Sequence, residues 1–206
     1  MENVLELYKE PYDEKQPVVC MDESSKQHLR AVRKTLPVEP GKPERYDTEY
    51  ERHGTSNLFI FFEPLRGWRR IDTTPRRTAQ DWAMQIKKLV DEDYPKAEKV
   101  RLVMDNLNTH VGASLYKTFE PSEARRLLEK LEFHYTPKHG SWLNMAEIEF
   151  SLLSRQCLSD RMVDRDYLSQ EVNAWVKQRN GKNSEMNWRF TTADARIKLK
   201  HLYPSI

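Results

Sequence analysis

The sequence predicts an α/β fold, built on a mixed β-sheet of about five strands with helices on both faces. Apolar runs of strand length come first as a hairpin and later alternate with amphipathic helical segments, the order typical of a layered sheet. Two of these runs end at an aspartate, and in α/β sheets functional groups gather beyond the carboxyl ends of strands. The 206 residues are enough for one sizeable core.

The first elements are a linker, a strand, a loop and a hairpin. Residues 1–16 are rich in charge and are interpreted as a lead-in or linker. Residues 17–24, PVVCMDES, are typical of a buried strand that ends at an acid. Residues 36–55 hold three prolines and two glycines without a hydrophobic period, which predicts a loop. Residues 56–64 and 67–74 then predict a hairpin.

Helices and strands alternate in the rest of the chain. A helix is predicted to begin at Thr78, which forms a capping box with Asp81, and to end before Pro95. The apolar run at 99–105 predicts the next strand. Four further elements follow in order: a helix at 121–131, a strand at 131–137, a long helix from near Trp142, and a helix at about 164–179.

Composition excludes several classes of protein. The 34 Lys and Arg nearly balance the 32 Asp and Glu, so the formal net charge of +2 indicates no particular partner. Cys20 and Cys157 lie in apolar segments and are interpreted as reduced core residues of a cytosolic protein. No stretch approaches the ~20 apolar residues of a transmembrane helix. No motif indicates a zinc site or a nucleotide-phosphate site.

Basic residues are concentrated in two segments. Between Pro64 and Arg77 five arginines accompany one acid, Asp72, and between Lys177 and Lys200 seven basic residues accompany two acids. Such segments suit a polyanion, but a basic stretch is as often an ordinary solvated surface. Composition leaves both interpretations open.

Two aspartates occupy equivalent places in the predicted sheet. The apolar run of residues 18–21 ends at Asp22, and the run of residues 102–104 ends at Asp105. If the strands are parallel neighbours, two carboxylates about 4 Å apart repel by roughly 1 kcal/mol in water and ~4 kcal/mol at a dielectric constant of about 20. Either one is protonated or a cation lies between them, and oxygen ligands favour Mg²⁺ or Mn²⁺. The alternative is that each aspartate only caps its strand or opens a turn.

A third acid is expected from the helix that starts near Trp142. An apolar stripe runs along one side of this helix at about 100° per residue: Leu143, Ala146, Phe150, Leu153 and Cys157. Glu147 falls within the edge of the stripe, and Glu149 falls outside it. Because a carboxylate aimed at a sheet is costly unless a charged group receives it, Glu147 is the better candidate ligand and Glu149 the solvated residue. The alternative is that Glu147 is a flanking residue paired with a lysine.

Four phrases extend this pattern over most of the chain: MDES (21–24), RLVMDNLNTH (101–110), HGSWLNMAEIEF (139–150) and NWRFTTADARIKLKHLYP (187–204). Together they resemble the catalytic domain of prokaryotic insertion-sequence transposases of the mariner superfamily, from about Pro17 onward. The resemblance implies an RNase H-like fold with a D–D–E metal triad. Asp22 and Asp105 match the two aspartates, and Glu147 matches the glutamate of the family's Asn-Pro-Ile-Glu block, in which Met-Ala replaces Pro-Ile here.

The resemblance also implies a reaction and its partners. The triad would hold two Mg²⁺ (or Mn²⁺) ions, water would cleave DNA at the transposon ends, and the new 3′-OH would attack target DNA, with TA as the target dinucleotide. The implied partners are double-stranded DNA, carrying the terminal repeats and the target, and a second copy of the chain in a homodimeric active complex. The implied location is the cytoplasm of a prokaryote, in association with the nucleoid.

Several polar residues flank the predicted triad and are candidate DNA contacts: Asn106, His110, Lys138, His139, Arg69, Arg70, Arg76 and Arg77. The cation and exposed amides at the start of the Glu147 helix suit phosphate. The alternatives are that the asparagine builds a turn, that each histidine is satisfied within the protein or faces solvent, and that the arginines are a solvated surface.

The resemblance divides the chain into the linker at 1–16 and an RNase H-like catalytic domain at 17–206, with the family's upstream helix-turn-helix domain expected to be absent. Two other functions stay open. One is another RNase H-like nuclease, a resolvase or a ribonuclease H, which uses the same acids on a different substrate. The other is a DNA-binding remnant of a transposase without catalysis.

Overall fold

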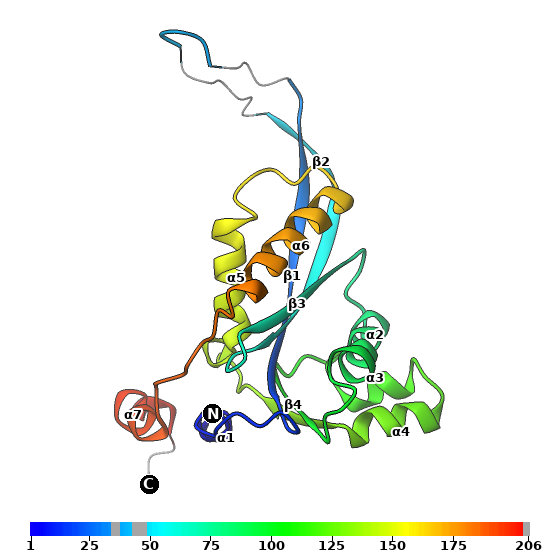
Figure 1. Cartoon of the computed structure of the whole chain (residues 1–206), viewed down its shortest axis with the longest axis vertical. Helices are drawn as coiled ribbons and strands as arrows, with labels where there is room; N and C mark the ends of the chain where they lie inside the picture. Colours follow the sequence, from blue (N-terminus) through cyan, green and yellow to red (C-terminus); the bar gives the residue numbers. More distant parts are fainter. Residues whose placement is uncertain (34–37, 43–48, 204–206) are drawn as a thin grey trace.

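A single five-stranded sheet forms the centre of the protein (Figure 1), in a computed structural model that describes residues 1–33, 38–42 and 49–203. The strands, in chain order, are β1 (Val18–Ala31), β2 (Tyr50–Glu63), β3 (Trp68–Thr74), β4 (Val100–Met104) and β5 (Leu131–Tyr135). They lie in the order β3-β2-β1-β4-β5. β1, β2 and β3 pair antiparallel, whereas β4 pairs parallel with both β1 and β5. The predicted mixed sheet of about five strands is confirmed.

Helices cover both faces of the sheet (Figure 1). On one face lie α2 (Ala79–Lys88), its π-helical continuation η1 (Leu89–Asp93), α3 (Gly112–Tyr116) and α4 (Pro121–Glu129). On the other lie the 3-10 turn η2 (Ser141–Leu143), α5 (Met145–Gln156) and α6 (Arg165–Gly181). Near the chain ends, α7 (Thr192–Lys198) lies beside α1 (Glu2–Leu7) and is followed by η3 (Lys200–Leu202).

The alternation of side chains along β1 creates two cores. Val19 and Met21 point into the core with the α2 layer, which contains Trp82. Cys20 points into the core with the α5 layer, which contains Leu153. Every residue of β4 is buried, because this strand lies inside the sheet with helices on both faces.

Most of the predicted elements are present. The 56–64 and 67–74 hairpin is β2–β3, and the runs at 99–105 and 131–137 are β4 and β5. The helix predicted from Thr78 begins with the expected capping box, in which the Thr78 side chain accepts a hydrogen bond from the backbone of Asp81. The short helices α3 and α7 were not predicted, because five and seven residues are too few to show a helical period.

Residues 1–16 are more than the linker that their charge predicts. Within them α1 buries Val4, Leu5 and Leu7 in the core of the α5 layer. Tyr8 is also buried, and its hydroxyl donates a hydrogen bond to the carbonyl of Leu143, 2.8 Å away. Six residues between charged neighbours carry little hydrophobic period, so the burial of this segment was missed. The domain boundary at residue 17 stays a prediction.

The loop predicted at 36–55 is shorter than expected, because β2 begins at Tyr50, which pairs with Ala31 at the end of β1. The β1–β2 ribbon extends away from the helical layers (Figure 1). Its outer part, including residues 50–55, is exposed on both faces, so no apolar alternation marked it as a strand. Residues 36–37 and 43–48 of the predicted loop lie outside the described residues.

Two further findings concern the cysteines and the membrane. Cys20 is buried and Cys157 half-buried, and both are free thiols. Within the described ranges, no helix combines the length and the apolar character needed to cross a membrane.

Candidate functional site

Asp22 and Asp105 are brought together by the parallel pairing of β1 with β4. The last paired residues of the two strands are Cys20 and Val103. Asp22 lies two positions after Cys20, and Asp105 lies two positions after Val103. The prediction that these strands are parallel neighbours is therefore confirmed. The buried β4 run fixes the backbone that leads into Asp105, which is the first residue after the strand.

Asp22 does not end its strand, because β1 continues beside β2 and Asp22 lies opposite Ile60. Its Oδ1 accepts a hydrogen bond from the backbone N–H of Glu23, 2.7 Å away. Burial, together with the negative charges of Glu147 and Asp105, raises the pKa of Asp22 to about 7. No Lys or Arg of the described residues forms an ion pair with it. The carboxylate is thus partly desolvated and lacks a countercharge.

Glu147 reaches this region from the first turn of α5. The helix begins at its N-cap Asn144, whose side-chain oxygen accepts a hydrogen bond from the Ala146 N–H at 3.2 Å. The Asn144 side-chain amide also donates to the carbonyl of Met21 at 2.8 Å, which ties the helix start to the residue before Asp22. Glu147 is exposed and lies close enough to raise the pKa of Asp22.

Glu149 is not the solvated residue that the helix phase predicted. It is fully buried, and its Oε1 lies 2.8 Å from Nη2 of Arg179 on α6 and 3.4 Å from Nη2 of Arg69 on β3. The buried side of α5 also includes Met145, which the predicted stripe left out, so the buried side lies closer to Glu149 than the stripe indicated. Two arginines distant in sequence supply the charge that this buried carboxylate needs.

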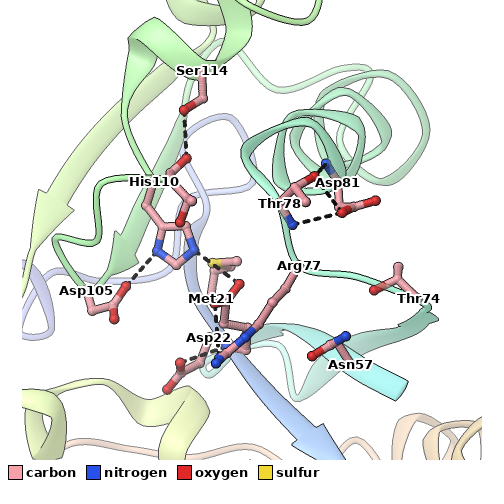
Figure 2. Close-up of polar contacts among 12 residues, drawn as sticks. Met21, Asp22, Asn57, Thr74, Arg77, Thr78, Asp81, Asp105, His110 and Ser114 are labelled. Carbon is pink, nitrogen blue, oxygen red and sulfur yellow. Dashed lines mark hydrogen bonds and ion pairs between the residues drawn. The ribbon is translucent and has the colours of Figure 1, made fainter. Parts of the chain in front are cut away.

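His110 is fully buried, so the prediction that it contacts DNA is wrong. Its Nδ1 lies 2.6 Å from Oδ1 of Asp105, as Figure 2 shows, and its Nε2 lies 3.4 Å from Oε2 of Glu23. Its ring stacks on Trp82 with the centroids 5.8 Å apart. Burial opposes protonation of the ring, but the two carboxylates outweigh it and raise the pKa of His110 to about 9.

The four candidate arginines separate into two buried and two exposed residues. Arg69 is fully buried and donates to the carbonyl of Ser184, besides its ion pair with Glu149. Arg70 is buried against the Phe61 ring and Asp93, so the prediction of DNA contact is wrong for both. These two residues lie on a strand packed under helices, whereas Arg76 and Arg77 lie in the exposed segment before α2.

A cleft opens beside Asp105. It has a volume of about 570 Å³ and is lined by residues 105–107 and 136–141, which include the predicted contacts Asn106, Lys138 and His139. His139 has a φ of 61°, in the left-handed region, so the backbone turns sharply there. The structure therefore brings three of the predicted DNA contacts to the edge of the candidate site.

The donor set fits a divalent cation. Asp22 and Glu147 have no cationic partner among the described residues, and Oδ2 of Asp105 accepts no hydrogen bond from them. Carboxylates with a free oxygen, without cysteine ligands, suit Mg²⁺ or Mn²⁺. In the described part of the chain, no three His, Cys, Asp or Glu side chains are already gathered closely enough to hold a metal ion. The carboxylates face a common region but are not drawn together.

Sequence reasoning missed two residues of this site. Glu23 follows Asp22 and points to the opposite face of β1, where it meets His110; the alternation of side chains along a strand is the signal for this. Asn144 was noted only as part of the resemblance, although an asparagine before a helix is an N-cap signal.

One protein family matches most of the chain. Residues 17–169 match the family described as DDE superfamily endonuclease. None of the curated proteins compared with the chain matches it.

The chain is also similar to solved structures of one transposase. The Mos1 transposase paired-end complex with left transposon end is 15% identical, with a TM-score of 0.40 and coverage of 91% of this chain and 62% of that chain. The Mos1 mariner paired end complex with Mn is 15% identical, with a TM-score of 0.33 and coverage of 89% and 60%. The Mos1 Strand Transfer Complex is 14% identical, with a TM-score of 0.34 and coverage of 89% and 59%. The chain thus spans less than two thirds of the Mos1 chain in each comparison.

Proposed function

The chain belongs to the DDE superfamily endonucleases, and on this premise we propose that it carries the catalytic domain of a DNA transposase. The proposed activity is divalent-metal-dependent cleavage at transposon ends, followed by strand transfer into target DNA. The observation that carries it is the placement of Asp22 and Asp105, each two positions beyond the last pair of the parallel β1–β4 ladder. Glu147 lies close to Asp22, and no Lys or Arg of the described residues forms an ion pair with any of the three.

Asp22, Asp105 and Glu147 are the proposed ligands of two Mg²⁺ or Mn²⁺ ions. Such ions would stabilise charge on the attacking and leaving oxygens of a phosphodiester. The rigid β4 run holds the backbone before Asp105, and the Asn144 amide holds the start of α5 against β1. The fold therefore fixes the elements that carry all three acids before any ligand binds.

The reaction consists of two in-line substitutions at phosphorus. In the first, water attacks the phosphodiester at the transposon end, the P–O3′ bond breaks, and the strand leaves with a free 3′-OH. In the second, that hydroxyl attacks a target phosphodiester, so one P–O bond forms and another breaks. Neither step requires a covalent intermediate with the protein.

The exposed residues around the cleft are the proposed DNA contacts. Lys138 and His139 precede α5 and line the cleft with Asn106, where backbone amides and a cation suit a phosphate. Arg76 and Arg77 are exposed in the segment before α2, and Arg77 reaches Glu23, the residue after Asp22. Pairing of two transposon ends implies a homodimer, and action on chromosomal DNA implies a nucleoid-associated protein in the cytoplasm of a prokaryote.

The test is cleavage of a labelled duplex that carries the DNA bordering the gene, in Mg²⁺ or Mn²⁺, with a supercoiled plasmid present as the target. We expect nicked duplex and joined products from the wild type and neither from Asp105→Ala. Equal product from both proteins would disprove the assignment of the triad.

Two other substrates separate the alternatives in the same assay. Cleavage of an RNA–DNA hybrid in preference to the duplex would indicate a ribonuclease H, and cleavage of a four-way junction would indicate a resolvase. Binding of the duplex without cleavage of any substrate would indicate a non-catalytic remnant.

A further inference from the structure

His110 is a fully buried histidine whose two ring nitrogens both face carboxylates. Nδ1 lies 2.6 Å from Asp105 and Nε2 lies 3.4 Å from Glu23. The ring also stacks on Trp82, so it is held on three sides. A side chain fixed in this way against a proposed metal ligand can determine how that ligand is oriented.

We propose that His110 is a positioning residue, which holds the Asp105 carboxylate in the orientation required by a divalent cation, while Glu23 holds the His110 imidazole. This inference rests on the proposed function, in which Asp105 is a metal ligand. It assigns His110 a role through Asp105, without contact with DNA or with the reacting atoms.

Asp105 needs such support because packing does not fix its side chain. It is the first residue after β4, and 37% of its side chain is exposed. Oδ1 accepts the hydrogen bond from His110, whereas Oδ2 accepts none from the described residues and stays available for a cation. Metal-ligating carboxylates are commonly held by such hydrogen bonds from a second layer of residues.

Glu23 links this support to the neighbouring strand. It follows Asp22 on β1 but projects to the opposite face, where it meets His110. The pairing of β1 with β4 ends at Cys20 and Val103. Beyond this point the contacts of His110 with Glu23 and Asp105 join β1 to the segment after β4. Arg77 contributes as well, since its Nη1 lies 3.4 Å from Oε1 of Glu23.

The backbone that carries His110 is anchored separately. The Tyr135 hydroxyl at the end of β5 donates to the His110 carbonyl at 3.0 Å. The Ser114 hydroxyl on α3 donates to the Thr109 carbonyl at 2.8 Å, as shown in Figure 2 beside the ring contacts. The ring is thus presented to Asp105 by a loop that is tied to two elements.

The experiment measures Mn²⁺ binding to the full chain, from the electron paramagnetic resonance signal of free Mn²⁺, so it needs neither DNA nor turnover. His110→Phe keeps a planar ring against Trp82 but removes both donors, and we expect Mn²⁺ to bind about ten- to hundredfold more weakly. His110→Asn keeps an N–H near the position of Nδ1, and we expect it to recover most of the lost affinity.

His28 provides a matched control. It is a buried histidine on β1 whose Nε2 lies 2.8 Å from the Ser56 hydroxyl, and no carboxylate of the described residues forms an ion pair with it. His28→Phe should lower the unfolding temperature and leave the Mn²⁺ affinity of the folded protein unchanged. If His110→Phe does not fold, Glu23→Gln takes its place, with a smaller loss of affinity expected because the imidazole keeps its bond to Asp105.

Wild-type affinity in folded His110→Phe, or an equal loss of affinity in His28→Phe, would overturn the positioning role. So would a failure of His110→Asn to bind Mn²⁺ better than His110→Phe. Asp105→Asn separates this result from the proposed function. If Asp105→Asn binds Mn²⁺ as the wild type does, the ligand assignment itself fails. If it loses binding while His110→Phe does not, only the positioning role fails.

Discussion

Asp22 on β1 and Asp105, the first residue after β4, each lie two positions beyond Cys20 and Val103, the last pair of the parallel ladder between these strands. The pairing of β1 with β4 therefore brings two acidic residues to the same part of the sheet. Because Glu147 and Asp105 are near enough to act on Asp22, keeping the buried Asp22 carboxylate ionised costs stability. That cost is visible in the pKa of Asp22, which burial and the neighbouring acids raise to about 7.

The first prediction concerns Asp22→Asn. Asparagine keeps an oxygen for the Glu23 N–H but removes the charge. In EDTA at pH 8 we expect the variant to have a higher free energy of unfolding than the wild type, by at most about 4 kcal/mol, the value that a shift of about three pKa units represents. Urea denaturation followed by circular dichroism measures this difference.

With Mn²⁺ added, the wild type should be more stable than Asp22→Asn, because the wild type gains stability from the bound ion and the variant gains little. A variant that is less stable than the wild type in EDTA would contradict the view that the charge of Asp22 is uncompensated.

The second prediction compares two glutamates on α5. Glu149→Gln removes the charge that pairs with the buried Arg69 and Arg179, so we expect the free energy of unfolding to fall by about 3–5 kcal/mol. Glu147→Gln changes an exposed side chain, so we expect a change within about 0.5 kcal/mol but no DNA cleavage. The two variants carry the same substitution on one helix and are measured in the same urea and cleavage assays. A stability loss in Glu147→Gln equal to that in Glu149→Gln would contradict the assignment of the two roles.

The sequence predicted what local patterns encode. The apolar run before Asp105 predicted the buried strand β4. A similar apolar run before Asp22 predicted β1, the strand that pairs with β4. The capping box at Thr78 marked the start of α2. These features depend on residues within a few positions of each other, so one sequence is sufficient to show them.

Contacts between distant segments could not be predicted in the same way. Arg69 and Arg70 were expected at a surface, but Arg69 meets Glu149 and Arg70 meets Asp93, partners 80 and 23 residues away. His110 was taken for a DNA contact because it follows Asp105, and its second partner, Glu23, lies 87 residues away. A buried charged residue looks like a surface residue until its countercharge is known, and that depends on the tertiary fold.

The third prediction distinguishes exposed from buried arginines in DNA binding. Arg76→Ala removes an exposed cation beside the candidate site, so we expect weaker binding to duplex DNA of any sequence and a salt dependence reduced by about one charge. Fluorescence anisotropy of a labelled duplex at several salt concentrations measures both quantities. Arg125→Ala is the control, because Arg125 is an exposed arginine on α4 outside the two basic segments. An equal loss in both variants would show that only net charge matters.

Arg70→Ala should act through stability. It leaves the largely buried carboxylate of Asp93 without its arginine and Asp72 with Lys88 alone, so we expect a lower unfolding temperature. The fraction that stays folded should bind DNA with the salt dependence of the wild type.

The last prediction is a pH dependence that arises away from the site. Glu63 ends β2 with its side chain only 2% exposed, and its Oε2 accepts a hydrogen bond from the Tyr94 hydroxyl at 2.7 Å. Burial raises the pKa of Glu63 above its ordinary value of 4.5, although Tyr94 and Arg66 oppose the shift. At a pH between the pKa of Glu63 in the unfolded chain and its higher pKa in the folded protein, the folded protein keeps a proton that the unfolded chain has released. This contribution to stability is therefore fully present below the ordinary pKa and is lost as pH rises through the folded pKa.

Glu63→Gln cannot release that proton, so its free energy of unfolding should rise relative to the wild type as pH increases from 4 to 8. Any constant offset from burying the new amide does not affect this trend. Urea denaturation at several pH values measures it, with Glu98→Gln as the control, since Glu98 is an exposed partner of Lys15. If the difference in the free energy of unfolding between Glu63→Gln and the wild type does not change with pH, the pKa of Glu63 is the same in the folded and unfolded states. If the stability of Glu63→Gln relative to the wild type rises toward acid, the pKa of Glu63 is lowered by folding. Either result would contradict the prediction.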